Sequence, residues 1–286
     1  MKRQKIKSGE TIGVIGCGNM GSALLKGMVR SRRFSPQRVL AWDPDSGRLA
    51  TLVRSLGIRK VRSNREIALR SQTILLAVKP QQMERVLQEI RPYLRHRPLI
   101  VSIAAGIPIR WIEKEAGSRI PVVRVMPNTP ALVGAGISAL AKGRAAKARD
   151  LAVAENVFQC VGQTLRVPES WMDAVTAVSG SGPAYFFYLM EQMIGTGIRL
   201  GLSPEAARHL VLQTAVGAAK LACQSGESPE VLRARVTSKG GTTEAAFREF
   251  EKRRLGKILE GGIQAAARRS KQGRSILGHS RGHSTS

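Results

Sequence analysis

Short apolar runs alternate with amphipathic stretches along the first 165 or so residues of the chain. The runs are rich in β-branched side chains, and each is followed by a turn that contains glycine or proline. Continuous apolar runs are typical of strands buried on both faces of a parallel sheet, and their alternation with helices is typical of βαβ units. The pattern predicts strands over residues 11–15, 39–42, 73–78, 99–103 and 122–125, with 137–140 and 164–167 as candidates to complete the sheet.

Beyond about residue 168 the pattern becomes helical. The stretch 184–199 is apolar on nearly all sides, which predicts a helix that is buried on several faces. The stretch 206–223 repeats apolar residues at helical spacing and has Pro204 near its start. Its many small residues allow a second helix to approach closely, so we expect a subunit interface in this half of the chain.

Length and composition agree with two ordinary domains. The chain has 286 residues, of which 43% are hydrophobic, so it can bury a real core. Its apolar runs stop short of the ~18 residues that a membrane span needs, and the polar, basic amino terminus does not look like a signal peptide. The three cysteines, Cys17, Cys160 and Cys223, lie far apart, which argues against a disulfide framework or a metal site. We therefore expect a soluble cytoplasmic protein without a metal.

The net charge of +26 is the unusual bulk property. Lysine and arginine are spread along the whole chain and are densest near its two ends, and no aromatic-studded basic strand or zinc finger accompanies them. The charge therefore favours a basic, solvated surface over nucleic-acid binding. It would also attract anionic substrates and cofactors.

A glycine-rich loop directly follows the first predicted strand. Its G-x-G-x-x-G pattern consists of Gly16, Gly18 and Gly21, includes Asn19 and Met20, and opens an amphipathic helix with Met20 on its inner face. In a dinucleotide-binding βαβ unit the first glycine makes the tight turn, the second lets the backbone approach a pyrophosphate, and the third lets helix and strand pack. The phosphates then lie at the positive end of the helix. This context predicts a Rossmann-type domain.

The second strand ends at Asp43, 22 residues after Gly21. An acid at this place bonds the ribose hydroxyls of NAD(H) and repels the 2′-phosphate of NADP(H). Arg48 and the basic composition argue the other way. NADH is therefore slightly favoured over NADPH.

Four further segments and a glycine-threonine loop make the sequence specific. They are Ala77-Val78-Lys79-Pro80, then Ser102 to Gly106 (SIAAG), Met126 to Pro130 (MPNTP), Ser179 to Tyr185 (SGSGPAY) and Gly240-Gly241-Thr242-Thr243. In this order and at this spacing they resemble the pyrroline-5-carboxylate reductase family, over roughly residues 11 to 270. The resemblance implies an α/β Rossmann-type dinucleotide-binding domain followed by an all-α dimerisation domain. The expected division is a basic extension at 1–10, the Rossmann domain at 11–167, the helical substrate and dimerisation domain at 168–270, and a disordered tail at 271–286.

The resemblance also implies an activity, the last step of proline biosynthesis. Hydride passes from NAD(P)H to the C=N carbon of 1-pyrroline-5-carboxylate and gives L-proline, in a homodimer or a higher homo-oligomer. Pyrophosphate would bind on the loop from Gly16 to Gly21, and Asn64 would lie near the adenosine. Toward the nicotinamide, the cofactor would be lined by Val78, Lys79, Pro80 and Ala104.

For the substrate, the resemblance implies a carboxylate site in the loop Gly241-Thr242-Thr243, with Ser238 beside it. The Thr243 hydroxyl would lie near the ring nitrogen, which makes Thr243 the catalytic candidate. Backbone N–H groups at a helix start, together with threonine hydroxyls, bind a carboxylate without a charged side chain. The alternative is that Glu244 closes an ordinary capping box here.

The absence of a motif histidine fits this reaction. A carbonyl reductase generally needs a proton donor beside the substrate oxygen, whereas a cyclic imine can bind already protonated at nitrogen. The enzyme then mainly orients two reactants. Lys79 is the remaining charged candidate, and contact with the cofactor is the better interpretation of it.

The chain departs from the family at one position in the glycine-threonine loop, where Lys239 stands in place of the usual proline. This difference puts the loop shape and the substrate affinity in doubt, but not the reaction type.

Two alternatives to this function stay open. One is another imine or 3-hydroxyacid reductase of the same two-domain plan, although the lysine expected after the domain junction is missing from 184–199. The other is a non-catalytic nucleotide-sensing or nucleic-acid-binding protein.

Overall fold

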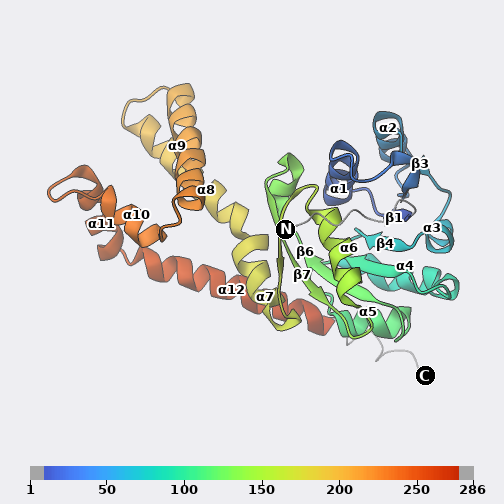
Figure 1. The fold of residues 1–286 in the computed structure, drawn as a ribbon. Helices are drawn as coiled ribbons and strands as arrows, with labels where there is room; N and C mark the ends of the chain where they lie inside the picture. The colour runs from blue at the N-terminus through green and yellow to red at the C-terminus, as the bar shows by residue number, and fades with distance from the viewer. Residues whose placement is uncertain (1–9, 277–286) are drawn as a thin grey trace, which may run out of the picture. The chain divides into compact units, whose positions relative to one another are not determined.

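The computed structural model describes residues 10–276, and within them the chain forms one eight-stranded sheet of order β3-β2-β1-β4-β5-β6-β7-β8 (Figure 1). This order, with β1 in the middle and crossovers to either side, is that of a doubly wound dinucleotide-binding fold. The strands are β1 (Ile12–Ile15), β2 (Val39–Trp42), β3 (Arg59–Lys60), β4 (Thr73–Leu76), β5 (Leu99–Ser102), β6 (Val122–Met126), β7 (Gly136–Lys142) and β8 (Gly162–Arg166).

Helices cover both faces of the sheet, and each face has its own apolar core. Alternate side chains of the central strands point to opposite faces, so Val14 of β1 belongs to one core and Ile15 to the other. One face is covered by α1 (Asn19–Arg30), α2 (Ser46–Leu56) and α6 (Ala148–Phe158), and the other by α3 (Asn64–Arg70), α4 (Met83–Ile90) and α5 (Ile109–Ala116).

The register brings the carboxyl ends of the central strands to one edge of the sheet. Ile15 pairs with both Trp42 and Leu76, and Leu76 pairs with Ser102. The loops that follow β1, β2, β4 and β5 therefore leave the sheet at the same level. Doubly wound folds bind their ligands at this edge.

Three features of the sheet differ from the prediction. The strand expected over 73–78 ends at Leu76, so its last two residues begin the following loop. The edge strand β3 was not predicted, because two charged residues carry no apolar signal. β7 runs antiparallel to β6, because the connection from Met126 to Gly136 is too short for the helical crossover that a parallel pair needs.

The chain forms two compact units. Among the described residues, the amino-terminal unit comprises 10–181 and also takes in 266–276, while the helical unit comprises Gly182–Ala265. The first unit thus extends past residue 167, where the sequence placed its end. The extension includes the 3₁₀ turn η5 (Glu169–Trp171), α7 (Met172–Val175) and the π-helical turn η6 (Thr176–Gly180).

The helical unit contains α8 (Gly182–Arg199), α9 (Pro204–Ser225), α10 (Pro229–Arg235), α11 (Thr242–Lys252) and the first part of α12 (Leu255–Ile276). The two predicted helices, 184–199 and 206–223, are thus confirmed and are slightly longer. Among the described residues, no helix is both long enough and apolar enough to cross a membrane.

Two expectations about the helical half are wrong. The apolar helix 184–199 is not buried within a single chain, since Phe186, Phe187 and Tyr188 are each more than 60% exposed. The tail expected to be disordered from 271 continues as helix α12 to Ile276, because lysine, glutamine and arginine, three of the tail's first four residues, are good helix formers. Residues 277–286 lie outside the described part of the chain, as do residues 1–9 of the expected basic extension.

Candidate active site

The three glycines of the first loop have distinct geometric reasons to be glycine. Gly16 adopts a φ of 95°, and a Cβ atom there would lie 2.7 Å from the carbonyl oxygen of Ala77. A Cβ atom on Gly21 would overlap the carbonyl oxygen of Gly16. Gly18 instead faces open space, with no heavy atom within 4 Å of where its Cβ would be. Gly16 and Gly21 thus shape the turn, and Gly18 leaves room for a ligand to approach the backbone.

Helix α1 starts without a competing acceptor. Gly18 is its N-cap residue and provides no side chain, and its first turn contains no acidic residue. The N–H groups of Asn19, Met20 and Gly21 are among those that a helix leaves without internal partners. These donors and the positive end of the helix dipole are suited to a diphosphate.

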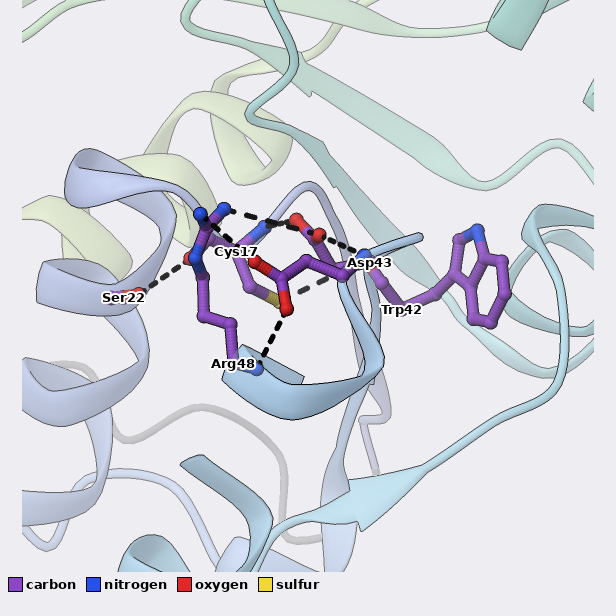
Figure 2. Close-up of polar contacts among 6 residues, drawn as sticks. Cys17, Ser22, Trp42, Asp43 and Arg48 are labelled. Atoms are coloured by element: carbon purple, nitrogen blue, oxygen red, sulfur yellow. Dashed lines mark hydrogen bonds and ion pairs between the residues drawn. The ribbon is translucent and has the colours of Figure 1, made fainter. Parts of the chain in front are cut away.

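Asp43 follows β2 and forms polar contacts with this loop (Figure 2). Its Oδ2 accepts the Cys17 N–H at 2.6 Å, and its Oδ1 accepts the Asp45 N–H at 2.8 Å. The residue is only 6% exposed. Arg48 lies between two acids, with Nη1 4.0 Å from Asp43 Oδ1 and Nη2 3.1 Å from Asp45 Oδ2. Asp43 therefore holds the glycine loop, a role that the sequence did not reveal.

The thiol of Cys17 is inert in this setting. Burial raises its pKa to about 12, and the adjacent Asp43 carboxylate adds to the shift, although Arg48 opposes it. At neutral pH the side chain is an uncharged group packed beneath the loop. The Cys17 carbonyl accepts the Ser22 hydroxyl at 2.6 Å, which ties the loop to the first turn of α1.

Asn64 is the first residue of α3, and Ser63 caps that helix through its bond from the Glu66 N–H. The Asn64 side chain is largely buried, and its Nδ2 donates to Glu89 Oε2 at 2.9 Å. Its Oδ1 is buried without a hydrogen-bond partner among the described residues. A buried acceptor left over in this way calls for an explanation, and a bound cofactor that donates to it is one.

The remaining predicted cofactor residues follow β4 and β5 at the same edge of the sheet. Val78 and Lys79 lie in the loop after β4, and Pro80 starts the 3₁₀ turn η2 (Pro80–Gln82). Ala104 follows β5 and is buried, with its N–H bonded to Ser102 Oγ at 3.3 Å. The structure thus gathers at one edge all the positions that the sequence assigned to the cofactor, although their contacts with it stay predictions.

The predicted substrate residues lie in the helical unit at the start of α11. The Gly241 N–H bonds to the Ser238 carbonyl at 3.0 Å, and the intervening Gly240 has a φ of 73°. Gly241 is the N-cap residue and brings no side-chain cap, so the N–H groups of Thr242 and Thr243 are left for an anion. Glu244 reaches back instead, and its Oε2 accepts the Gly240 N–H at 2.8 Å.

Sequence reasoning missed a polar contact beneath the carboxyl edge of the sheet. Arg124 of β6 is 1% exposed, and its Nη1 lies 3.3 Å from Glu169 Oε1. The same oxygen accepts the Ile109 N–H at 2.7 Å. A charged residue in the otherwise apolar strand VVRVM was the available signal, because such a residue needs a partner when buried.

Comparison with known proteins gives this arrangement a family. Residues 169–273 match the family model described as pyrroline-5-carboxylate reductase dimerisation. Residues 11–106 match the one described as NADP oxidoreductase, coenzyme F420-dependent. The first match covers the whole helical unit, and the second covers the loops after β1, β2 and β4 and the first part of the loop after β5.

Individual relatives match along almost the whole chain. A pyrroline-5-carboxylate reductase of Pseudomonas aeruginosa is 44% identical over 260 residues, which are 91% of this chain and 95% of that one. The solved structure of such a reductase from Coxiella burnetii has a TM-score of 0.87 at 34% identity and covers 92% of this chain and 98% of its own. The Plasmodium falciparum structure, with NADP bound, has a TM-score of 0.84 at 31% identity and covers 93% and 98%. With both units covered at these identities, the chain belongs to the pyrroline-5-carboxylate reductase family and is an NAD(P)H-dependent oxidoreductase.

Proposed function

We propose that this chain reduces the C=N bond of 1-pyrroline-5-carboxylate to give L-proline, the last step of proline biosynthesis. The observation that carries the proposal is the second uncapped helix start, at Gly241 to Thr243, in the helical unit. A dinucleotide-binding domain alone explains only the cofactor. The second helix start adds a site for a small carboxylate and thus selects an anionic substrate.

When bound, NAD(P)H supplies the hydride. The loop from Gly16 to Gly21 holds the pyrophosphate through the free N–H groups of α1, including those of Asn19 and Met20. Asn64 accepts a bond at the adenosine end through its spare Oδ1. Val78, Lys79, Pro80 and Ala104 line the way toward the nicotinamide, and their mostly short or apolar side chains let the ring lie close.

On the substrate side, the N–H groups of Thr242 and Thr243 bind the carboxylate, with Ser238 holding the turn. The Thr243 hydroxyl lies near the ring nitrogen, where it orients the imine. The imine arrives protonated, so hydride addition at carbon yields the secondary amine without a proton donor from the chain. The position of His96 agrees with this, since it lies against the Ser71 carbonyl at 3.0 Å, at the amino edge of the sheet.

NADH is the slightly favoured cofactor in this proposal. Asp43 and Asp45 place two carboxylates beside one guanidinium, that of Arg48, so the turn after β2 stays net negative. A 2′-phosphate would meet this charge, whereas ribose hydroxyls would find acceptors. Each Asp43 oxygen already accepts one N–H bond and has a further lone pair for such a hydroxyl.

A homodimer completes the proposal. α8 exposes a run of large apolar side chains, and α9 adds Leu210, Val216 and Leu221, each more than half exposed. Such a surface is unstable in water and is typical of an obligate subunit interface. A second copy of the chain is the partner that the dimerisation match favours.

The test is a reductase assay on the purified full chain with 1-pyrroline-5-carboxylate, run in parallel with NADH and NADPH. We expect L-proline as the product and a modestly higher kcat/KM with NADH. A preference for NADPH would remove only the cofactor assignment. Salt-dependent retention on DNA together with no reduction under any condition would instead support the non-catalytic alternative.

A further inference from the structure

Glu169 joins three segments of the amino-terminal unit through a single carboxylate oxygen. Oε1 accepts the Ile109 N–H at 2.7 Å and lies 3.3 Å from Arg124 Nη1. The three residues belong to η5, to the start of α5 and to β6. We call them the Glu169 cluster.

Each segment of the cluster leads to one of the sequence motifs SIAAG, MPNTP and SGSGPAY, and the first of these contains Ala104, which the resemblance places toward the nicotinamide. Ile109 starts α5 directly after the loop that contains Ala104, and Arg124 precedes Met126 with only Val125 between them. η5 leads through α7 into the π-helical turn η6, which ends at Gly180. π-helical turns are rare and occur often at functional sites.

Two of these motifs are in direct contact. A Cβ atom on Gly180 would lie 2.5 Å from Met126 Cε, so the end of β6 packs closely against the end of the π-helical turn. A shift of either element would be passed to the other, because close-packed surfaces cannot slide freely. The π-helical turn therefore limits the space that is open to the Met126 side chain.

The carboxylate compensates two groups that would otherwise be costly. Pro108 is the N-cap residue of α5 and provides no side-chain cap, so Glu169 gives the first N–H of that helix an acceptor and places a negative charge at its positive end. Arg124 is buried on the face of the sheet that also holds Val122 and Met126. A buried guanidinium needs charged, hydrogen-bonded partners, and the Glu169 carboxylate is one of those that Arg124 has.

We propose that Glu169 is a positioning residue for hydride transfer, fixing the Ala104 loop and the Met126 strand end relative to the π-helical turn. It touches neither reactant. The inference rests on the proposed function only for the identity of the reaction. For this chain, it states that the Ala104 loop and the Met126 strand end are no longer held in fixed positions when the carboxylate is removed.

Glu169→Ala in the full chain tests this with three measurements. The first is kcat, which we expect to fall by about tenfold to a hundredfold, since a displacement of about 1 Å can cost about a hundredfold. The second is the fluorescence emission of bound NADH. The reduced nicotinamide fluoresces more strongly in a rigid site, so we expect this emission to decrease in the variant. The third is the Kd of ADP-ribose, which lacks the nicotinamide and should stay within about twofold, because the loops after β1 and β2 follow other strands than the one that carries Arg124.

Glu155→Ala is the matched control, because it breaks another carboxylate–arginine contact of the same unit, to Arg166 at 2.6 Å. This variant should leave kcat and NADH emission unchanged. Where Glu169→Ala does not fold, Glu169→Gln decides, since glutamine keeps a neutral acceptor for Ile109 but weakens the contact with Arg124. For Glu169→Gln we expect a kcat that is lower than that of the wild type by less than tenfold. The emission of bound NADH should also decrease, but by less than in a fully disrupted site.

Wild-type kcat and wild-type emission in a folded Glu169→Ala chain, or in Glu169→Gln if that is the only variant that folds, would overturn the proposal. The emission measurement needs no substrate. A wild-type chain that binds NADH but reduces no 1-pyrroline-5-carboxylate would therefore defeat the proposed function, while the emission of the variants would still decide the role of Glu169.

Discussion

Two helices of this chain, α1 and α11, begin in the same way but in different surroundings. Each follows a glycine and lacks a side-chain cap, so each presents free N–H groups to an anion. Before α1, Gly16 and Gly21 are buried against neighbouring backbone, and Asp43 holds the loop from outside. Before α11, Gly240 faces open space and the loop is supported by its own turn and by Glu244.

The difference shows two ways of building an anion site. The α1 loop is held by residues distant in sequence, so its shape exists before any ligand arrives and tolerates little change. The α11 loop is held by contacts within seven residues, from Ser238 to Glu244. Its geometry depends on the turn preferences of those few residues, and substitutions there should alter affinity more than folding. The following variants test this contrast, starting with the largest expected effect.

Gly21→Ala should be the most damaging substitution. Its Cβ would overlap the Gly16 carbonyl oxygen, and a backbone atom in a packed loop has nowhere to move. We expect a loss of about 1–3 kcal/mol or more in the free energy of unfolding, measured by urea denaturation, and no detectable NADH binding.

Gly18→Ala is the matched control for that loop, because its Cβ would enter open space. It should fold with wild-type stability but still weaken cofactor binding, since it narrows the approach to the backbone. Equal stability of the Gly21 and Gly18 variants would contradict the description of the α1 loop as rigid.

Thr243→Ala should affect only the substrate. Loss of one hydrogen bond to a charged ligand lowers kcat/KM by about tenfold to a hundredfold, seen as a higher substrate KM and a lower turnover. The Kd of NADH should stay near the wild-type value. Thr243→Ser keeps the hydroxyl and should recover most of the activity, whereas unchanged kinetics in the alanine variant would remove Thr243 from the site.

Asp43→Ser should change cofactor choice, and it should also weaken the binding of both cofactors because the Cys17 N–H loses its acceptor. Removing the buried carboxylate leaves Arg48 with one acid instead of two, so a 2′-phosphate becomes easier to accept. We expect the NADPH-to-NADH ratio of kcat/KM to rise about tenfold, which corresponds to ~1.4 kcal/mol. Asp45→Asn, a change at a half-exposed neighbour, should move the ratio less. An identical ratio before and after the Asp43 substitution would defeat the assignment.

Lys239→Pro should have the smallest effect, in the favourable direction. Lys239 is the second residue of the turn from Ser238 to Gly241, and the third, Gly240, has a positive φ. This pattern is that of a type II turn, in which proline suits the second position. We expect a gain of about 0.4–1 kcal/mol in stability and a change of less than about threefold in substrate KM. Lys239→Ala separates the lost charge from the added rigidity; destabilisation by proline would show that the turn is of another type.

The sequence predicted most of the sheet, because continuous apolar strands and glycine turns are local signals. The α1 loop could also be predicted, because the spacing of its three glycines indicates which one makes the tight turn and which one lets helix and strand pack. The sequence did not predict the antiparallel β7, since direction depends on the length of a connection whose 3₁₀ turn, Thr129–Val133, resembles a helix start. It also placed the apolar α8 in an interior that one chain does not provide.

In the candidate site, too, features that depend on local sequence could be predicted, whereas contacts between residues far apart in the chain could not. The family resemblance singled out Lys79 and Ala104, and the ends of the apolar runs placed both residues near the carboxyl edge of the sheet. The second role of Asp43, as acceptor for the Cys17 N–H, depends on a register that brings residues 26 apart together. The Glu169 cluster joins residues 45 and 60 apart, and only the folded chain shows which acid faces Arg124.

One more long-range contact bears on how the protein is made. Asp173 is buried, and its Oδ1 accepts the Ser270 hydroxyl at 2.8 Å, across 97 residues of chain. During synthesis the residues up to 181 leave the ribosome well before Ser270. The amino-terminal unit can therefore form its contacts with α12 only after the intervening helices have also been translated. Nascent chains halted before residue 266 should therefore present Asp173 without that bond, and protease sensitivity near α7 should decrease only when α12 is complete.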